Sequence, residues 1–369
     1  MSKPWLIYGA NGYTGTLIAE TAVAQGLHPI LAGRSEARLR PLAERLGLPW
    51  RVANLDDPAA MATLLADVGI VVHSAGPFVH TAEPMMQACL AAGTHYLDIT
   101  GEIPVFERAY ALDAEARRRG VCLIPGVGFD VVPSDCLARY VADRVVEPWS
   151  LDIAIATDGQ PSAGTAKSAL ESVFRGGLVR QDGALVPYAF GKGPRNIRFS
   201  DRRRLTMVIP WGDLASAYRS TRIPNITTLM ALPRESIRTL SRMQGLLPLV
   251  LPVIKGLMGV PGIQALINRL IAKRILGPDA DARQSGACYI WAEALDKSGE
   301  GVAAWLETAD GYQFTAAAAV ASVQHLLAEP RIGALTPAQA FGADFVLTIP
   351  GTRRFDSLPA ESGLAASAE

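Results

Sequence analysis

Three glycines near the start of the chain have the spacing of a phosphate-binding turn. Gly9, Gly12 and Gly15 directly follow the apolar run Trp5–Tyr8 and open a helix-like stretch. In such a unit the first glycine permits a tight turn and the second lets a diphosphate approach the backbone amides. The third lets helix and strand pack closely. With the helix N-terminus attracting phosphate, the spacing predicts a dinucleotide site formed by Gly9, Asn11, Gly12, Tyr13, Thr14 and Gly15.

The residues after the second apolar run indicate which dinucleotide binds. A site selective for NAD usually has Asp or Glu here to bond the ribose 2′-hydroxyl. This chain has Arg34 and Ser35, with Arg38 one helical turn later, and a guanidinium with a hydroxyl suits a 2′-phosphate. Alternatively, Ser35 only caps the next helix, or Glu36 contacts a 2′-hydroxyl. We expect NADP(H) as the cofactor.

The loop after the fourth apolar run, Ile70–His73, should border the same cofactor. In a parallel sheet, the loops at the carboxyl ends of the strands surround the ligand. Gly76 would let the nicotinamide-side ribose approach, and Pro77 would help to wall the ring. We therefore add four residues to the predicted cofactor site: Ser74, Ala75, Gly76 and Pro77. We interpret His73 as an ordinary histidine at a strand end.

Hydride transfer also requires a source of protons. Glu102 and Asp130 follow the fifth and sixth apolar runs, so both should lie at the carboxyl edge of the sheet. Lys167 lies in a stretch rich in Thr and Ser that could orient a carbonyl or a phosphate. These three are the candidate catalytic residues. Each has a structural alternative: a helix cap for Asp130, an ion pair for Glu102 and a solvated helix position for Lys167.

Apolar runs and helix-like stretches alternate over the first 130 residues. The expected strands are Trp5–Tyr8, Pro29–Ala32, Trp50–Ala53, Ile70–His73, Tyr96–Ile99 and Val121–Ile124. The expected helices are Tyr13–Gln25, Glu36–Leu46, Pro58–Ala66, Glu83–Ala92 and Val105–Arg119. Runs that are apolar on both faces and separated by helices indicate a parallel sheet covered on both sides. Residues 1–145 are therefore predicted to form an α/β domain, a doubly wound parallel sheet of the Rossmann type.

The pattern changes after about residue 145. The expected strands are now Leu151–Thr157, Thr206–Pro210, Ala287–Leu295 and Val302–Thr308, and the last two have the spacing of an antiparallel pair. We predict an α+β domain with a mostly antiparallel sheet over residues 146–310. Within residues 311–350, Thr315–Leu327 should form a helix that packs back on the first domain. Residues 356–369 are expected to be a disordered tail.

An apolar insert occupies residues 245–277. Pro248, Pro252 and Lys255 interrupt it before the roughly 20 apolar residues that a membrane-spanning helix needs. Its second part places Ile263, Leu266, Ile267, Leu270, Ile271 and Ile275 on one helical face. We interpret it as a buried helical insert or a dimer surface. Peripheral lipid contact through residues 246–276 and an apolar substrate wall are the alternatives.

Composition narrows the classes of protein. A chain of 369 residues suggests about two domains, and 49% hydrophobic with 19% charged residues describes a folded globular protein. Lys+Arg and Asp+Glu number 35 each, so the chain lacks the excess of basic residues that is usual in proteins that bind nucleic acid. We therefore expect a small-molecule substrate. Four scattered cysteines without a C-x-x-C predict reduced thiols and no metal site. Without a secretory signal pattern, we expect a cytoplasmic protein.

The order of these motifs resembles the saccharopine dehydrogenase-like oxidoreductase family, and within it the branch of trans-acting enoyl reductases. The motifs are the glycine turn, Ala32–Ser35, Ala75–Phe78, Tyr96–Glu102 and Gly126–Asp130, and the likeness is dense over residues 5–140. The resemblance implies an NADP-binding domain followed by a substrate and dimerisation domain, with catalysis between them. It also implies that Thr100, Gly101 and Asp130 lie near the nicotinamide or the substrate.

We therefore expect an NADP-dependent oxidoreductase that transfers a hydride to an unsaturated (enoyl), apolar or acyl substrate and forms a homodimer. Reduction of an activated C=C bond needs few ionisable groups from the protein. One alternative is a saccharopine-type imine dehydrogenase, whose substrate carboxylates would be bound by Arg175, Arg180, Arg195, Arg198 and Arg202–Arg204. The other is a protein that binds NADPH at a lipid surface without turnover.

Overall fold

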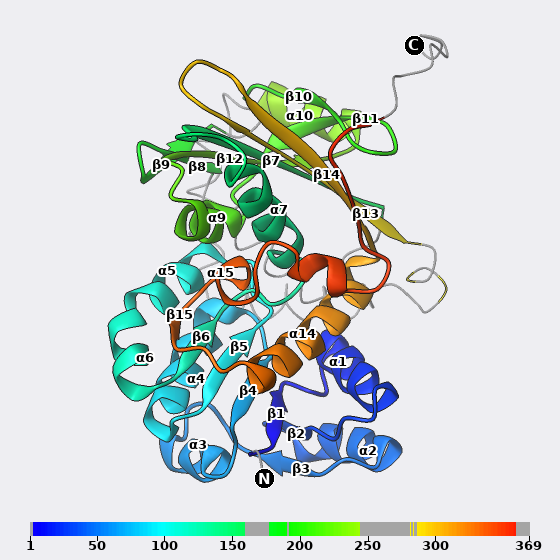
Figure 1. The fold of residues 1–369 in the computed structure, drawn as a ribbon. Coiled ribbons are helices and arrows are strands. Elements are labelled where there is room, and N and C mark those ends of the chain that lie inside the picture. Colours follow the sequence, from blue (N-terminus) through cyan, green and yellow to red (C-terminus); the bar gives the residue numbers. More distant parts are fainter. Residues whose placement is uncertain are drawn as a thin grey trace.

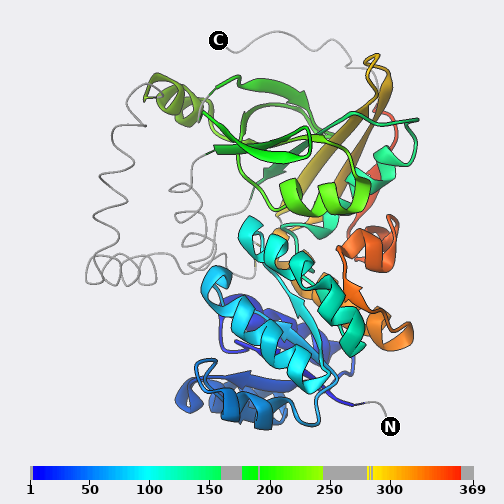
Figure 2. The same cartoon turned by 90° about the vertical axis from the view of Figure 1, so that its left-hand side faces the viewer.

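The chain forms two regions, each built on one β-sheet and drawn one above the other in Figure 1. The computed structural model describes residues 3–158, 177–189, 192–243, 281, 283 and 286–358. Lys167, the apolar insert 245–277 and the tail from residue 359 onward lie outside these residues. A view turned by 90° keeps the two regions separate, with the N-terminal one below (Figure 2).

The N-terminal region contains a seven-stranded parallel sheet in the order β15-β6-β5-β4-β1-β2-β3. Its strands are β1 (Trp5–Tyr8), β2 (Ile30–Gly33), β3 (Trp50–Val52), β4 (Ile70–His73), β5 (His95–Asp98), β6 (Cys122–Ile124) and β15 (Gly333–Ala334). This confirms the predicted doubly wound α/β fold. The order reverses between β1 and β4, which is the point where ligands bind in such sheets.

Six helices connect these strands. They are α1 (Tyr13–Ala24), α2 (Glu36–Leu46), α3 (Pro58–Leu65), α4 (Phe78–Ala92), α5 (Ile103–Ala111) and α6 (Asp113–Arg119). The clearest differences from the prediction concern α4, α5 and α6. Helix α4 begins at Phe78 instead of Glu83, and the single helix expected over Val105–Arg119 is divided at Leu112, whose ψ is 4°. The early start of α4 is explained by hydrogen bonds to Glu102 in the candidate site.

The second region contains a mixed sheet in the order β10-β11-β12-β7-β13-β14-β16, with the β8–β9 hairpin attached to β12. Its strands are β7 (Ser150–Thr157), β8 (Gly177–Gln181), β9 (Ala184–Tyr188), β10 (Arg195–Arg198), β11 (Arg203–Val208), β12 (Asn225–Ala231), β13 (Ala287–Leu295), β14 (Gly301–Ala309) and β16 (Arg353–Phe355). Among the described strands of this second sheet, only β7 and β12 pair in parallel. The predicted mostly antiparallel sheet, including the β13–β14 pair, is confirmed.

Helices join the two regions. Helices α7 (Val132–Ala142) and α9 (Asp213–Thr221) pack together, and Leu137 of α7 shares a core with Ile153, Ile290 and Leu306 of the second sheet. Helix α14 (Gly311–Ala328) returns to lie beside α1, where Ala316 and Ile18 share a core. The remaining helical elements are α10 (Arg234–Met243), α15 (Pro337–Phe341) and the 3-10 helix Phe345–Thr348.

The cysteines offer no reactive thiolate. Cys89, Cys122, Cys136 and Cys288 are buried free thiols. Burial raises the pKa of Cys122 and of Cys288 to about 12, so both stay protonated at neutral pH. In the described part of the chain, no helix has the length and apolar character needed to cross a bilayer.

Candidate functional site

The glycine turn lies between β1 and α1, beside the end of β4. Gly9 has a φ of +85°, and a Cβ atom there would lie 2.8 Å from the backbone nitrogen of Ala75. A Cβ on Gly15 would overlap the carbonyl oxygen of Gly9, so neither position accepts a side chain without movement. Gly12 begins α1 without a side-chain cap, which leaves the helix N-terminus suited to phosphate oxygens. This cradle fits a dinucleotide diphosphate.

The loop after β4 closes one side of the cradle. The hydroxyl of Ser74 donates to the carbonyl oxygen of Tyr8 at 2.9 Å, and Thr81 donates to the carbonyl oxygen of Ala75 at 2.6 Å. Pro77 then occupies the N-cap position of α4. Ser74 therefore ties β4 to β1 with its side chain, while the backbone of Ala75 is the part of the loop that approaches Gly9.

The end of β2 presents the residues predicted to bind the 2′-phosphate. Arg34 is exposed, and within the described residues neither Arg34 nor Arg38 forms an ion pair, whereas Arg40 on the same helix pairs with Glu44 at 2.7 Å. Ser35 is at the N-cap position of α2, but its hydroxyl makes no capping hydrogen bond. The Ser35 hydroxyl is thus not used to cap the helix. The carboxamide oxygen of Asn11 lies 3.0 Å from where a Cβ of Gly33 would stand.

The substitution Arg34→Ala should weaken NADPH binding by about 10- to 100-fold, because a charge-assisted hydrogen bond to phosphate contributes roughly 1.5–3 kcal/mol. NADH, which has no 2′-phosphate, should lose much less affinity. Fluorescence titration of both cofactors measures the difference, and Arg40→Ala is the control on the same helix. Equal losses for NADPH and NADH would contradict this assignment.

Asp130 lies where the two regions meet. It follows β6, and its carboxyl group packs against Gly101, where a Cβ would lie 2.8 Å from Asp130 Oδ2. The residue is partly exposed, and no hydrogen bond to the carboxyl group is present among the described residues. Burial, with a smaller effect from the negative charge of Glu102, raises the pKa of Asp130 to about 6. A carboxyl group with that pKa can act as a proton donor near neutral pH.

Glu102 contacts the N-terminus of α4. Its two carboxylate oxygens accept hydrogen bonds from the backbone nitrogens of Phe78 at 3.0 Å and Val79 at 2.8 Å. A carboxylate at this place stabilises the N-terminus of a helix, which explains why α4 begins at Phe78. Glu102 thus caps α4, and its role as a proton donor stays a prediction.

Asp98 organises the loops on which Gly101 and Asp130 stand. Its Oδ1 atom accepts hydrogen bonds from the backbone nitrogens of Thr100 at 2.9 Å and Gly126 at 2.8 Å, so it joins the loops after β5 and β6. Thr100 is completely buried, and its hydroxyl accepts from the backbone nitrogen of Glu102 at 3.0 Å. Thr100 thus supports the loop from within.

The second region contributes two residues that the sequence did not indicate. Trp211 Nε1 donates to the carbonyl oxygen of Asp130 at 2.6 Å. At Gly212 a Cβ would lie 2.8 Å from Cε2 of Phe106 and 3.3 Å from the carbonyl oxygen of Gly101. These contacts hold the loop before α9 directly against both loops of the candidate site. No local pattern could indicate them, because the partners are far apart in the chain.

The substitution Gly212→Ala should therefore destabilise the protein by about 1–3 kcal/mol, as expected for an added methyl group in a filled space. The φ of Gly212 is −52°, which any residue adopts, so the effect would come from the close contacts alone. Urea unfolding followed by circular dichroism measures it. An unchanged midpoint would show that the two regions are not packed as closely as described.

His73 has no catalytic features. It is completely buried, its Nε2 lies 3.0 Å from Thr81 Oγ1, and burial lowers its pKa to about 3. The imidazole is therefore neutral at physiological pH, as expected for a strand-end histidine. Lys167, the third candidate catalytic residue, lies outside the described residues.

Comparison with known protein families decides the nature of the N-terminal region. Residues 5–124 match the saccharopine dehydrogenase NADP binding domain. This part of the chain is similar to that domain family. The match confirms the predicted family resemblance and the prediction of NADP(H) as the cofactor. The match also agrees with the glycine cradle and with the two arginines, Arg34 and Arg38, that follow β2.

Individual relatives extend the comparison. A trans-acting enoyl reductase of Mycobacterium leprae is 34% identical over 150 residues, which are 38% of this chain and 36% of that protein. Another, of Mycobacterium ulcerans, is 29% identical over 157 residues, covering 40% of this chain and 38% of that protein. The matched segment thus spans little more than a third of these relatives. Apo saccharopine dehydrogenase (L-Glu forming) of Saccharomyces cerevisiae has the same fold, with a TM-score of 0.63 and 12% identity over 94% of this chain and 96% of that one.

Proposed function

We propose that this protein is an NADPH-dependent reductase of an unsaturated acyl (enoyl) substrate and that Asp130 supplies the proton. The observation that carries the proposal is the position of Asp130, a partly exposed residue that packs against Gly101 at the carboxyl edge of an NADP-binding domain, where burial raises the pKa of its carboxyl group to about 6. The name of the mycobacterial relatives supports reduction of a C=C bond as the reaction class.

Each part of the candidate site has its own role in the proposed reaction. NADPH, when bound, supplies a hydride to the β-carbon of the substrate. The cradle of Gly9, Gly12 and Gly15 would hold its diphosphate, and Arg34 with Ser35 its 2′-phosphate. Asp130 would donate its proton to the α-carbon, so that one hydride and one proton saturate the double bond. Because Asp130 is partly exposed, it can regain a proton from water.

An imine dehydrogenase is less well supported, because several arginines proposed for the substrate carboxylates have structural partners. Arg180 is buried and donates to the carbonyl oxygens of Leu214 and Gly183, both at 2.6 Å, and to Glu107 at 3.0 Å. Two more have acidic partners: Arg195 pairs with Asp152 at 2.7 Å, and Arg204 pairs with Asp201 at 2.8 Å. Arg175 lies outside the described residues.

A carbonyl reductase of the short-chain type is also less well supported. Tyr188 and Lys192 have the Tyr-x-x-x-Lys spacing that such enzymes use. Here, however, Tyr188 ends strand β9 of a hairpin in the second sheet, and Lys192 is exposed beyond it. The ammonium group lies 5.7 Å from the centre of the Tyr188 ring. The pair therefore belongs to a different sheet from the glycine cradle.

The domain division and the partners are part of the proposal. We assign residues 1–145 to cofactor binding and residues 146–310 to substrate binding and dimerisation, with 311–350 returning to the first domain. Light scattering of the purified protein would test the homodimer. Lipid contact through residues 246–276 would be tested by sedimentation with vesicles, and failure to sediment would exclude it.

The activity is tested by following the absorbance of NADPH with purified protein and a panel of substrates. The panel contains short and long enoyl thioesters, an unsaturated ketone, and aminoadipate semialdehyde with glutamate. We expect turnover on an unsaturated substrate. Turnover only on the semialdehyde mixture would favour imine chemistry. No turnover on any of them, with tight NADPH binding, would favour a non-catalytic binding protein.

A further inference from the structure

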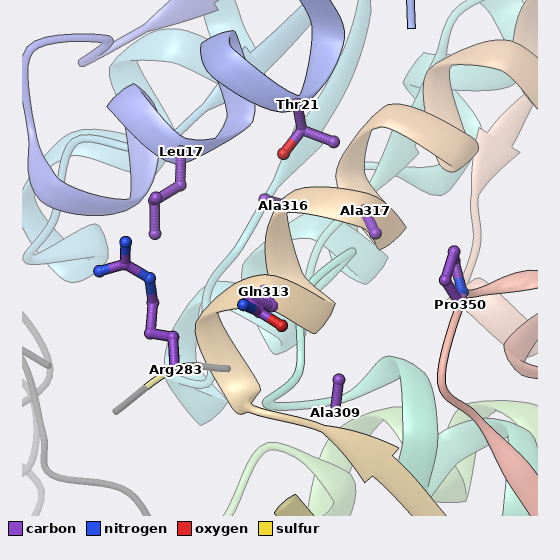
Figure 3. Close-up of a pocket in the computed structure, with 8 residues that line it drawn as sticks. All are labelled: Leu17, Thr21, Arg283, Ala309, Gln313, Ala316, Ala317 and Pro350. Carbon is purple, nitrogen blue, oxygen red and sulfur yellow. The ribbon is translucent and has the colours of Figure 1, made fainter. Parts of the chain in front are cut away.

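Helix α14 packs against both elements that the proposed reaction must bring together, the cofactor helix α1 and the loop of Asp130. Ala316 of α14 shares a core with Ile18 of α1, and α1 begins at the glycine cradle. Figure 3 shows the seam of the two helices, with Leu17 on α1 and Ala317 on α14. The N-terminal part of α14 contacts the loop after β6, which carries Asp130. One helix thus joins the cofactor site to the candidate proton donor.

Thr315 of α14 makes the polar contact with this loop. Its hydroxyl group accepts a hydrogen bond from the backbone nitrogen of Phe129 at 3.0 Å and donates one to the carbonyl oxygen of Gly311 at 2.7 Å. A Cβ atom on Gly128 would lie 2.9 Å from the methyl carbon of Thr315, so the loop is closely packed against the side chain. Because Thr315 and Phe129 are both buried, removing the hydroxyl group would leave the amide of Phe129 without a partner, which is costly.

The side chain of Phe129 is held by the same helix. Its ring packs edge-on against the ring of Phe314, with 6.1 Å between the ring centres, and a Cβ atom on Gly311 would lie 3.2 Å from it. Asp310 caps the N-terminus of α14 and so fixes where the helix begins. The residue directly before Asp130 is therefore held by α14 through both its backbone and its ring.

The backbone of Asp130 is also held on its other side. Trp211 Nε1 donates to the carbonyl oxygen of Asp130, and this hydrogen bond leaves the carboxyl group of Asp130 uninvolved. Thr315 and Trp211 thus fix the chain on both sides of the candidate acid, from positions far away in the sequence.

We propose that Thr315 is a positioning residue: by holding Phe129, it keeps the carboxyl group of Asp130 in place to donate its proton. This inference rests on the proposed function, in which Asp130 is the proton donor. The direction of the Asp130 side chain follows from its backbone, and a shift of about 1 Å near a reacting group can lower a rate by about 100-fold. Helix α14 is suited to this role because it also packs on α1, the helix that begins at the cofactor cradle.

The test uses Thr315→Val in the full chain, which keeps the shape of the side chain and removes its hydroxyl group. We expect kcat on an enoyl thioester to fall by about 10- to 100-fold. The dissociation constant of NADPH should stay unchanged, because Thr315 lies outside the glycine cradle. Thr315→Ser, which keeps both hydrogen bonds, should retain most of the activity.

The matched control is Ser322→Ala in the same helix. The hydroxyl group of Ser322 is completely buried and donates to the carbonyl oxygen of Ala318 at 2.7 Å, so it makes the same bond within the helix as Thr315 makes to Gly311. Ser322→Ala should leave kcat unchanged. The comparison of Thr315→Ser with Thr315→Ala repeats the test without the second methyl group of valine, which covers the case that Thr315→Val does not fold.

A second measurement needs no turnover. Protein labelled with ¹³C at the aspartate carboxyl carbons is titrated by NMR, and the signal of Asp130 is assigned by its loss in Asp130→Asn. In Thr315→Val the carboxyl group of a displaced Asp130 would be better hydrated, so its pKa should fall from about 6 toward its ordinary value. In Ser322→Ala it should not move.

The outcomes separate this inference from the proposed function. If the unaltered protein reduces no enoyl thioester, the proposed function fails, and the NMR titration alone decides whether Thr315 holds Asp130. The positioning role is overturned if Thr315→Val keeps both the kcat and the Asp130 pKa of the unaltered protein, even when it unfolds more easily. It is also overturned if Thr315→Ser or Ser322→Ala loses as much activity as Thr315→Val, because the contact with Phe129 would then not be the cause.

Discussion

The substitution Asp130→Asn should lower kcat/KM for NADPH-dependent reduction by about 10²- to 10⁴-fold, the usual contribution of a positioned general acid. Asparagine has nearly the same shape, so the packing against Gly101 and the bond from Trp211 to the backbone carbonyl of residue 130 should remain. NADPH affinity should change little, because the carboxyl group is not part of the glycine cradle. Steady-state kinetics and a cofactor titration measure the two effects separately.

The matched control is Asp143→Asn, which removes an exposed carboxylate that pairs with Arg139 near the end of α7. It should leave kcat/KM within a factor of two or so, as for most surface substitutions. If Asp130→Asn kept the activity of the unaltered protein, the proton would have to come from another group or directly from water. The assignment of Asp130 would then be wrong.

The same substitution should make the protein more stable above pH 6. The pKa of Asp130 is raised in the folded state to about 6, above its value in an unfolded chain. Because the folded protein then holds the proton more tightly than the unfolded chain, the free energy of unfolding is greatest below the pKa of the unfolded chain. It falls as the pH rises to the pKa of the folded protein. Asp130→Asn removes this penalty, and we expect a gain of about 1–2 kcal/mol at pH 8, reduced by the partial exposure of the side chain. A lower free energy of unfolding for Asp130→Asn than for the unaltered protein at pH 8 would contradict this expectation.

The pH dependence of activity gives the second large effect. If protonated Asp130 is the acid, kcat/KM should fall about tenfold for each pH unit above a midpoint near 6. Glu102→Gln should move this midpoint to lower pH, because the negative charge of Glu102 contributes to the raised pKa of Asp130. Its amide oxygen can still accept from α4, so the helix N-terminus should remain partly capped.

The readout is the pH profile of kcat/KM for both proteins. A purely structural role of Glu102 would lower activity at every pH without moving the midpoint, which would contradict the electrostatic part of this account. A profile of the unaltered protein that stays flat from pH 5 to pH 8 would contradict the role of Asp130 itself.

The N-terminal sheet could be predicted because its signals are local. Strands β1 and β4 and helix α2 have the bounds that their apolar patterns predicted. The glycine turn could be identified because its steric requirements fall on three residues that are close in the sequence, Gly9, Gly12 and Gly15. Each of several successive strand–helix units indicates the same parallel sheet. An error in predicting one element therefore does not change the predicted fold.

Other features depend on contacts between distant residues. The early start of α4 depends on Glu102, which lies 24 residues from Phe78. The contact of Trp211 with Asp130 spans 81 residues. The hairpin of β8 and β9 did have a local signal, the turn Asp182-Gly183 with φ values of 48° and 81°, which sequence analysis overlooked.

The most direct test of the central claim is the position of hydrogen in the product. An enoyl thioester would be reduced in deuterated water with ordinary NADPH, and the saturated product analysed by mass spectrometry and NMR. We predict one hydrogen from the cofactor on the β-carbon and one deuterium from solvent-exchanged Asp130 on the α-carbon. The absence of any saturated product, although NADPH binds, would contradict the proposed function.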